Sequence, residues 1–393
     1  MLKIRIENLL DKVVTDMKLG DVCESVSLTF RRQQDKIILI NTSDVLDGKV
    51  TNHEYVPNKN LKGQFKKSFQ LEDILYSEIR PKNRRFAYID FNADDYVAST
   101  KLMVIRANDK ILPQFLFQVL KSDEIIDQLQ LLAETRSGTF PQITFSELAS
   151  LDVRIPPIPE QKEIAATLSC FDEKILNISE KNHHLEQIAQ VIFKSWFVDF
   201  EPWGGKRPIN WRDVELGDVV TLNAGGDKPV LCSSTPTNEC SIPVFSNGID
   251  NFGLYGYTDL PKVTEESVTV SARGTIGFVC LRQEPFVPIV RLITAIPNKE
   301  FITAKFLYLY LNSIHIAGVG TTQQQLTVPD FKKHRILVPN SDVVNNFTET
   351  VATMFDSIRH NRIENARLVK IRDTLLPRLM SGKLSASDIV GGK

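Results

Sequence analysis

The sequence predicts an α+β protein in which two globular domains alternate with two long helices of the coiled-coil type. Three observations lead to this fold class. The chain has 393 residues, more than a single hydrophobic core normally supports. It contains one long-range repeat, and each half ends in a heptad pattern of about 40 residues. The predicted bounds of domain, helix, domain, and helix with C-terminal tail are 1–155, 156–203, 204–340 and 341–393.

The repeat is visible at both ends of each half. The string LGDV at 19–22 recurs at 216–219. Near the end of each half, a polar turn leads into an extended run. Thr144 in the first turn aligns with Thr327 in the second, a shift of 183 residues. We therefore expect the two domains to share one fold.

Each long helical segment carries apolar residues at steps of mostly four and three, the spacing of a coiled-coil seam. The first seam comprises Ile164, Leu168, Phe171, Ile175, Ile178, Asn182, Leu185 and Ile192. The 183-residue shift leads to the second seam, which comprises Phe347, Val351, Met354, Ile358, Asn361, Asn365, Leu368, Leu375 and Leu379. Asn182 thereby matches Asn365, and a buried seam asparagine typically fixes register. The alternative is two ordinary amphipathic helices packed on their own domains, but such helices average only ~12 residues.

Start and stop signals agree with these helices. Prolines between 156 and 159 precede the first helix, and Glu160 in its first turn suits the helix dipole. The string EPWGG at 201–205 ends it. Gly382 is a suitable residue just beyond the second helix. Pro377 is expected to kink the second helix or to mark its last turn.

The globular parts mix strand-like and helical patterns. Strand-like runs occupy 102–107 and 267–281, and short helical patterns occupy 112–120 and 302–312. We therefore predict an α+β fold for each domain.

The composition is that of a globular protein, with 42% hydrophobic and 24% charged residues. The formal net charge of −1 argues mildly against nucleic acid when taken alone. The charges are distributed unevenly, however. Between 62 and 85, seven basic residues face three acidic ones, and between 160 and 199 four basic residues face seven acidic ones. Such zones are compatible with separate DNA-binding and protein-binding surfaces.

The five cysteines are scattered and form no C-x-x-C pair, which argues against a disulfide framework or a zinc site. No apolar run reaches the ~18 residues of a membrane span, and the first residues do not read as a signal peptide. We expect a cytoplasmic protein with reduced thiols and no membrane partner.

Two regions resemble the conserved regions of the specificity subunits of type I restriction–modification enzymes. The strings PPIPEQKEIAATL at 156–168 and FKSWFVDFEPW at 193–203 resemble the central region. The string ENARLVKIRDTLLPRLMSGKL at 364–384 resembles the distal region. The resemblance covers the whole chain in architecture, although the globular domains match only at their edges. One departure is that the second helix is entered through LVPNSDVVNNF, without a Pro-Glu-Gln signature.

The resemblance implies a non-catalytic, sequence-specific DNA-binding subunit. Each globular domain reads one half of a bipartite site in double-stranded DNA, and the two helices lie antiparallel between the domains. Two methyltransferase subunits dock near the helices, and restriction–translocase subunits join them. S-adenosylmethionine, ATP and Mg²⁺ belong to these partners, and this chain holds neither a cofactor nor a metal. The assembled complex would methylate adenine and cleave DNA.

Candidate DNA contacts lie in two loops of each domain, where long polar side chains could reach base edges or phosphates. The Pro-containing loop at 77–86 and its counterpart at 271–278 supply Arg80, Lys82, Arg84, Arg85, Arg273 and Thr275. The polar turns before the last strands supply Thr139, Gln142, Thr144, Thr321, Thr322, Gln323, Gln324, Gln325 and Thr327. The plain alternative for each loop is a solvated turn.

The sequence lacks the motifs that a catalytic function would require. Asp152 followed by Glu160-x-Lys162 imitates a nuclease motif, but prolines intervene and a helix start explains the charges. No phosphate-binding G-x-x-x-x-G-K-[ST] loop is present. The same lack of motifs argues against an enzyme that fuses recognition with chemistry. The alternative from another class is a coiled-coil scaffold or adaptor without specific DNA recognition.

Overall fold

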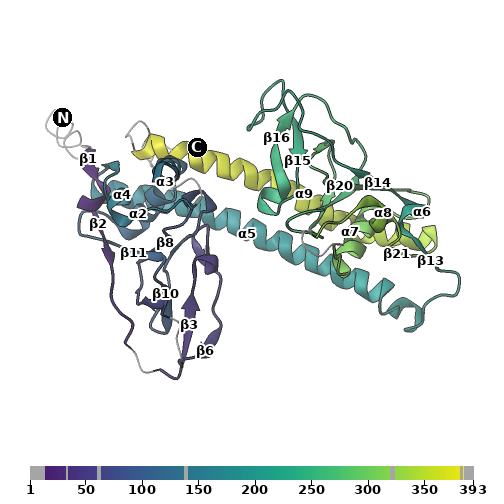
Figure 1. Ribbon diagram of the computed structural model, residues 1–393, viewed down its shortest axis with the longest axis horizontal. Coiled ribbons are helices and arrows are strands. Elements are labelled where there is room, and N and C mark those ends of the chain that lie inside the picture. The colour runs from purple at the N-terminus through teal and green to yellow at the C-terminus, as the bar shows by residue number, and fades with distance from the viewer. Residues whose placement is uncertain are drawn as a thin grey trace, which may run out of the picture. The chain divides into compact units, whose positions relative to one another are not determined.

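The computed structural model describes residues 14–31, 34–59, 63–136, 140–318, 324–380 and 384. Contacts divide the chain into two units. Unit 1 holds residues 1–177 and 364–393, and unit 2 holds residues 178–363. Each unit therefore contains one globular domain together with one stretch of each long helix (Figure 1).

The domain of unit 1 consists of short strands and three short α-helices. Its strands are β1 Thr15–Lys18, β2 Cys23–Val26, β3 Lys36–Ile40, β4 Val45–Leu46, β5 Lys49–Val50, β6 Tyr55–Pro57, β7 Phe65–Lys67, β8 Ile74–Ser77, β9 Phe86–Tyr88, β10 Tyr96–Ser99, β11 Leu102–Ala107 and β12 Asp152–Ile155. Its helices are α2 Pro113–Leu120, α3 Asp123–Arg136 and α4 Phe145–Ala149, with 3₁₀ turns η1 Leu19–Asp21, η2 Thr42–Asp44 and η3 Pro81–Asn83.

The central sheet of unit 1 has the strand order β2-β11-β8-β9 and is antiparallel throughout. Alternate residues of a strand face opposite sides of the sheet. Met103 and Ile105 accordingly join the cluster that contains α2 and α3, whereas Leu102 and Val104 join a second cluster. Both faces of the sheet are covered. This explains why the strand-like run at 102–107 is almost wholly apolar.

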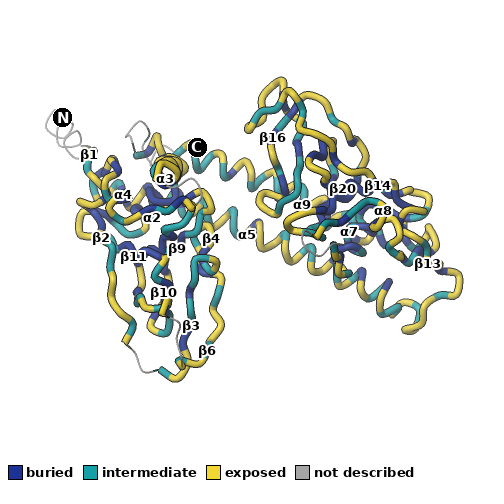
Figure 2. The backbone as a smooth tube through the Cα atoms, viewed as in Figure 1, coloured by how far each residue is buried: buried dark blue, intermediate teal, exposed yellow. Residues whose placement is uncertain are grey.

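A second sheet, with the order β6-β3-β10-β7, lies on the other face. Its inner residues Ile38, Ile40 and Ala98 pack in the same cluster as Val104 of the central sheet. Within unit 1, β3, β6 and β10 extend away from helices α2 to α4 (Figure 1). The buried stretches of the chain concentrate in the central strands, as Figure 2 shows.

The domain of unit 2 repeats this plan. Its strands are β13 Arg212–Glu215, β14 Val220–Ala224, β15 Ile242–Phe245, β16 Leu254–Thr258, β17 Ser267–Val270, β18 Val279–Arg282, β19 Val287–Pro288, β20 Ile293–Pro297 and β21 Arg335–Val338. Its helices are α6 Leu216–Val219, α7 Ala304–Ser313 and α8 Val328–Lys332, with 3₁₀ turns η4 Glu201–Trp203 and η5 Asp250–Gly253.

The sheet orders of the two domains correspond, except that β7 of unit 1 has no counterpart in the matching sheet of unit 2. The order β14-β20-β17-β18 matches β2-β11-β8-β9, and the order β16-β15-β19 matches β6-β3-β10. The correspondence extends to direction, because β15 pairs in parallel with β19 as β3 does with β10. The repeat inferred from the sequence is therefore a repeat of topology, and the predicted α+β fold class is confirmed.

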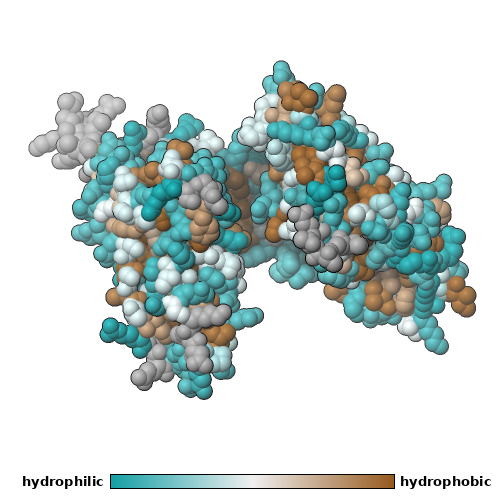
Figure 3. Space-filling view, viewed as in Figure 1, coloured by the Kyte–Doolittle hydropathy of each residue, from teal (hydrophilic) through white to brown (hydrophobic). Residues whose placement is uncertain are grey.

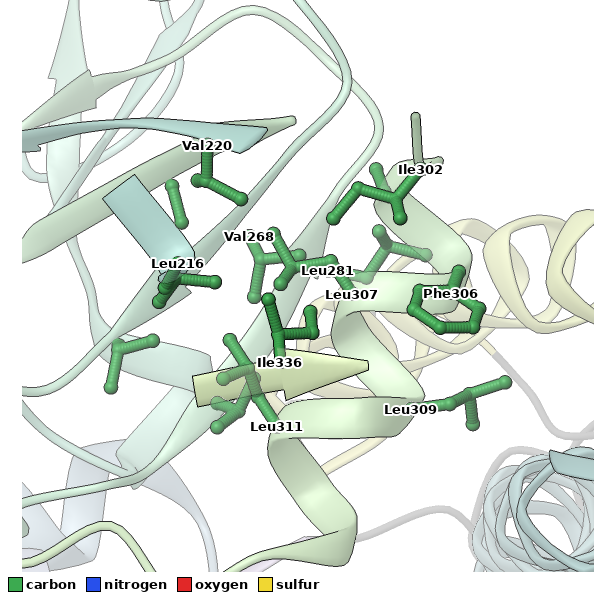
Figure 4. Close-up of a cluster of buried hydrophobic side chains, with 14 of the residues drawn as sticks. Leu216, Val220, Val268, Leu281, Ile302, Phe306, Leu307, Leu309, Leu311 and Ile336 are labelled. Atoms are coloured by element: carbon green, nitrogen blue, oxygen red, sulfur yellow. The ribbon is translucent and has the colours of Figure 1, made fainter. Parts of the chain in front are cut away.

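Helix α7 covers one face of the central sheet in unit 2. Phe306 and Leu307 of α7 belong to one buried cluster with Val268 and Leu281 of the strands (Figure 4). The opposite face differs from its counterpart in unit 1, because its buried side chains are largely polar: Ser267, Thr269, Arg282 and Thr294. The alternation SVTV therefore places valines on one face and hydroxyls on the other.

The LGDV string is repeated because each of its residues has a structural role. Leu19 and Val22 are fully buried. The carboxylate of Asp21 accepts a hydrogen bond from the Lys18 backbone N–H at 3.0 Å. A Cβ on Gly20 would lie 3.0 Å from the Cβ of Ala149 in α4, so a side chain there would press against that helix. In unit 2, a Cβ on the equivalent glycine would meet Lys332 of α8 at 3.1 Å.

The long helices are α5, Ile158–Phe197, and α9, Ser341–Met380. Helix α5 ends before the predicted limit at 203, because the chain turns at Phe200, whose φ is +53°, into η4. Pro377 lies within the last turn of α9. Gly382 lies outside the described residues.

All the predicted seam residues are buried or half-buried. Within unit 2, Asn182 contacts Asn361, whereas the later Phe193 contacts the earlier Phe347 at a ring distance of 5.9 Å. The two helical stretches therefore run antiparallel. Within unit 1, Leu168 of α5 joins the domain core. The helices thus pack against each other, as a coiled-coil seam predicts. They also pack into the domain cores, as the alternative of amphipathic helices on their own domains predicts.

Candidate nucleic-acid interface

Two loops of unit 1 that the sequence analysis singled out separately lie together in the structure. Ile79, in the loop between β8 and β9, forms an antiparallel bridge with Gln142, which precedes α4. The Arg80 N–H donates to the carbonyl of Pro141 at 3.1 Å, and the Ile143 N–H donates to the carbonyl of Glu78 at 2.8 Å. The two loops therefore form one continuous surface.

The four predicted cations of the first loop differ in their surroundings. Arg84 donates to Asp47 at 2.9 Å and to Asp123 at 2.8 Å, so it joins the β4–β5 hairpin to the start of α3. Arg85 donates to the backbone carbonyl of Ser43 at 3.1 Å. The ammonium of Lys82 lies 3.3 Å from Asp127.

Arg80 is exposed, and its guanidinium has no hydrogen bond or ion pair within the part of the chain that the structure describes. Its backbone φ of +45° is held by the short helix η3 that follows. Of the four cations, Arg80 and Arg85 form no ion pair with a carboxylate among the described residues, and of these two only Arg80 also lacks a hydrogen bond to a backbone carbonyl there.

Two residues of the polar turn before α4 form hydrogen bonds within the protein. Thr144 caps α4, and its hydroxyl donates to Glu147 at 2.9 Å in a capping box. Gln142 accepts a hydrogen bond from the Lys101 ammonium at 3.2 Å. Thr139 lies outside the described residues.

The corresponding loops of unit 2 also lie together. The Leu326 N–H donates to the carbonyl of Ala272 at 3.0 Å. The exposed Arg273 donates through Nε and Nη2 to the side-chain oxygen of Gln325, at 3.1 and 2.9 Å. The structure thus brings together two predicted residues that are 52 positions apart in the chain.

The remaining candidates of unit 2 fall into two groups. Thr275 and Gln324 are exposed on this surface. Thr327 caps α8 at the position equivalent to Thr144, and its hydroxyl accepts from the Asp330 N–H at 3.3 Å. The other members of the turn, Thr321, Thr322 and Gln323, lie outside the described residues.

Sequence reasoning missed a third loop at each surface, the turn that leads into the central strand. In unit 1 this turn carries Lys101, which lies 3.6 Å from Glu78 and also donates to Gln142. In unit 2 the equivalent turn between β19 and β20 carries the exposed Arg291. A basic residue just ahead of each central strand was the available signal.

The described residues contain no group of three or more His, Cys, Asp or Glu side chains placed to hold a metal ion. His183 and His184 are exposed neighbours on α5, with ring centroids 6.2 Å apart. Within the described ranges no helix is long and apolar enough to cross a membrane. On the face drawn in Figure 3, hydrophilic side chains cover most of each unit.

The family model described as "Type I restriction modification DNA specificity domain" matches residues 12–187 and again residues 208–372. The chain belongs to this family. The two matches reproduce the internal repeat, one in each half of the specificity subunit.

Known relatives agree with this assignment. The specificity subunit is 31% identical to the type I restriction enzyme HindI specificity subunit of Haemophilus influenzae, over 94% of this chain and 99% of the relative. It is 25% identical to the MjaIX specificity subunit of Methanocaldococcus jannaschii, over 72% and 71% of the two chains. The crystal structure of the type I S subunit from M. genitalium shares the fold, with a TM-score of 0.52, 17% identity and coverage of 94% and 96%.

The resemblance drawn from the conserved strings is thereby confirmed. This specificity subunit is a DNA-recognition component of a type I restriction–modification system and not the catalytic one. The alternative of a scaffold without DNA recognition has no support from these matches.

Proposed function

We propose that the chain reads a bipartite target in double-stranded DNA, with one half-site for each domain. The observation that carries this proposal is the duplication of one recognition domain with different side chains on the same loops. Unit 1 presents Arg80 and a Lys101 that is paired with Glu78. Unit 2 instead presents an exposed Arg291 and an Arg273 that is bound to Gln325. Because base-edge contacts depend on side-chain identity, the two surfaces are suited to two different sequences.

The loops have the chemistry that this reading requires. Arginine pairs in bidentate fashion with the O6 and N7 of guanine, and glutamine pairs with adenine. The paired Arg273 and Gln325 hold each other in place before DNA arrives, which lowers the entropy lost on binding. Exposed cations such as Arg80 add phosphate contacts, which position the protein and supply affinity.

We further propose that two methyltransferase subunits dock along the helices and that restriction–translocase subunits join them. The relatives named as restriction enzyme specificity subunits support assembly of this kind. The end of α5 in unit 2 suits a protein partner, because Ile188 and Val191 are 48% and 66% exposed and Val198, just after the helix, is 49% exposed. Apolar side chains exposed together favour protein contact. S-adenosylmethionine, ATP and Mg²⁺ would be held by these partners, which would methylate adenine and cleave DNA.

A domain exchange tests the proposal. Residues 204–340 are replaced by the matching domain of a relative with a different target, and the methylated motif of the host genome is mapped. We expect one half-site to change and the other to remain, because each domain carries its own sheets and its own candidate recognition loops. The reciprocal exchange of residues 1–155 serves as the control and should change the other half-site. A change of both half-sites in either chimera would contradict independent reading.

A further inference from the structure

The turn between β19 and β20 in unit 2 holds two consecutive non-glycine residues in the left-handed region. Val290 has a φ of +53° and Arg291 a φ of +61°. A β-branched residue in this region is an outlier, and such strain persists where the surroundings impose it, often at binding sites. Glycine would relieve the strain. Both positions nevertheless carry side chains, so this strained turn fixes the direction of the exposed Arg291 side chain.

The turn is held rigidly by its surroundings. The Val290 N–H donates to the carbonyl of Gly226 at 2.8 Å, and the Arg291 N–H donates to that of Gly225 at 3.0 Å. A Cβ on Gly225 would lie 2.8 Å from the backbone N of Ile289, so the two segments approach as closely as glycine allows. Rigidity of this kind preorganises an exposed side chain for binding.

The turn is joined to the candidate recognition loops through Asn247. The Asn247 amide donates to the carbonyl of Val290 at 2.6 Å and accepts from the Ala272 N–H at 2.7 Å. Ala272 in turn accepts from the Leu326 N–H at 3.0 Å. One side chain therefore connects the turn to both loops that carry Arg273 and Gln325.

The repeat supplies an independent comparison. The equivalent turn of unit 1 places Lys101 directly against Glu78 and Gln142, on the recognition surface. Lys101 is paired with a carboxylate there. Arg291 is exposed, and within the described ranges no side chain accepts a hydrogen bond from its guanidinium. The basic side chain at this position is thus paired with a carboxylate in unit 1 and exposed without a side-chain partner in the described part of unit 2.

We propose that Arg291 reads a guanine in the half-site of the second domain, through the O6 and N7 atoms in the major groove. This inference rests on the proposed function. A base contact is favoured over a phosphate contact because a phosphate can be reached by a flexible cation on any relaxed turn. A bidentate contact with a base edge requires a fixed side-chain geometry. The strained turn at Val290 and Arg291 and its hydrogen bond to Asn247 supply that geometry.

The test uses the complex with its methyltransferase subunits, binding to a library of duplexes that vary one base pair at a time. Arg291→Ala should lose about 5- to 150-fold of discrimination at one position of one half-site, the range of a lost bidentate pair. Non-specific affinity and the other half-site should stay unchanged. Lys299→Ala removes an exposed charge just beyond the far end of β20 and should leave all base preferences intact.

Arg291→Gly separates binding from folding. Glycine is relaxed at this φ, so its melting temperature should equal or exceed that of the wild type while the discrimination is lost. A phosphate contact would instead lower specific and non-specific affinity equally and reduce the slope of log affinity against log salt concentration by about 1. That result would overturn the inference. An unchanged preference would also overturn it. A wild-type complex without any sequence preference would overturn the proposed function itself.

Discussion

At the scale of single residues, unit 1 contains a group of charges that is largely withdrawn from solvent, formed by Lys121, Asp172 and Arg372. The Lys121 ammonium forms an ion pair with Asp172, and Arg372 donates to the same carboxylate at 2.9 Å. Gln118 adds a hydrogen bond at 3.0 Å. Burial would raise the pKa of Asp172, but the charge of Lys121 and these hydrogen bonds outweigh it and hold the pKa below the ordinary 3.8. The carboxylate is therefore ionised in the folded protein.

We expect Asp172→Asn to lower the free energy of unfolding by ~3–5 kcal/mol, because the buried Lys121 loses its counter-charge and Arg372 keeps only its ion pair with Asp373. The wild-type contribution is fully present above the ordinary pKa and is lost as pH falls through the lower pKa of the folded state. The difference between variant and wild type should therefore shrink below about pH 4. Urea titrations from pH 2 to 7 measure it.

Asp152→Asn is the matched control, because Asp152 forms an ion pair with Lys18 at side-chain exposures of 82% and 51%. Its effect should stay within about 1 kcal/mol at every pH. An Asp172→Asn variant as stable as this control would show that the buried charges are not a stabilising unit.

At the scale of elements, the two long helices carry polar residues where a coiled coil would place apolar ones. The Asn361 amide donates to the side-chain oxygen of Asn182 at 2.8 Å, and both residues are half-buried. Arg362, next along α9, donates to Glu186 at 2.9 Å. These contacts fix one register of the helices within unit 2, which apolar contacts alone would specify less strictly.

Asn182→Leu alone should cost ~1–3 kcal/mol of unfolding free energy, because the Asn361 amide loses a partner in a half-buried site. The double variant with Asn361→Leu should recover most of this loss or exceed the wild type, since no polar group is then left unpaired. Guanidinium denaturation of the four proteins gives the coupling energy. Asn177→Leu, at an exposed position of α5, is the control. Additive losses in the double variant would refute the coupling.

At the scale of the whole molecule, the chain makes one domain plan twice, and each unit takes a stretch of both α5 and α9. The helices therefore belong to the two units jointly. Under the proposed function, their length should set the distance between the half-sites. A change in helix length should therefore alter the spacing of the half-sites but not the bases that each domain recognises.

Inserting seven residues after Asn182 and seven before Asn361 should widen the gap between half-sites. A helix rises 1.5 Å per residue, so the insertion adds ~10 Å, and DNA rises ~3.4 Å per base pair, so the gap should grow by ~3 base pairs. Seven residues preserve the heptad phase. We expect reduced activity, because the far half-site also rotates by about a third of a turn.

Mapping the methylated motif decides the outcome. A one-helix insertion serves as the comparison and should abolish activity by mismatching the pair. An active two-helix variant that still methylates the original spacing would show that the helices do not set it.

Much of the fold could be predicted because its signals are local or periodic. The seam residues and the repeated LGDV string were identified from spacing, whereas the capping role of Thr144 and Thr327 came only from the structure. In each case the backbone geometry of a helix or turn demands particular residues at particular steps, whatever the rest of the chain does. The same reasoning identified both pairs of candidate recognition loops.

What the sequence by itself determined, then, was the repeat, the two long helices and the loops that carry polar side chains. Only the tertiary structure decided how those side chains are used. It pairs Arg84 with Asp47 and Asp123, leaves Arg80 open, and brings Arg291 beside the second recognition loop through Asn247. These contacts join residues tens of positions apart. No local periodicity encodes them, because they depend on how the sheets pack and where the strands end.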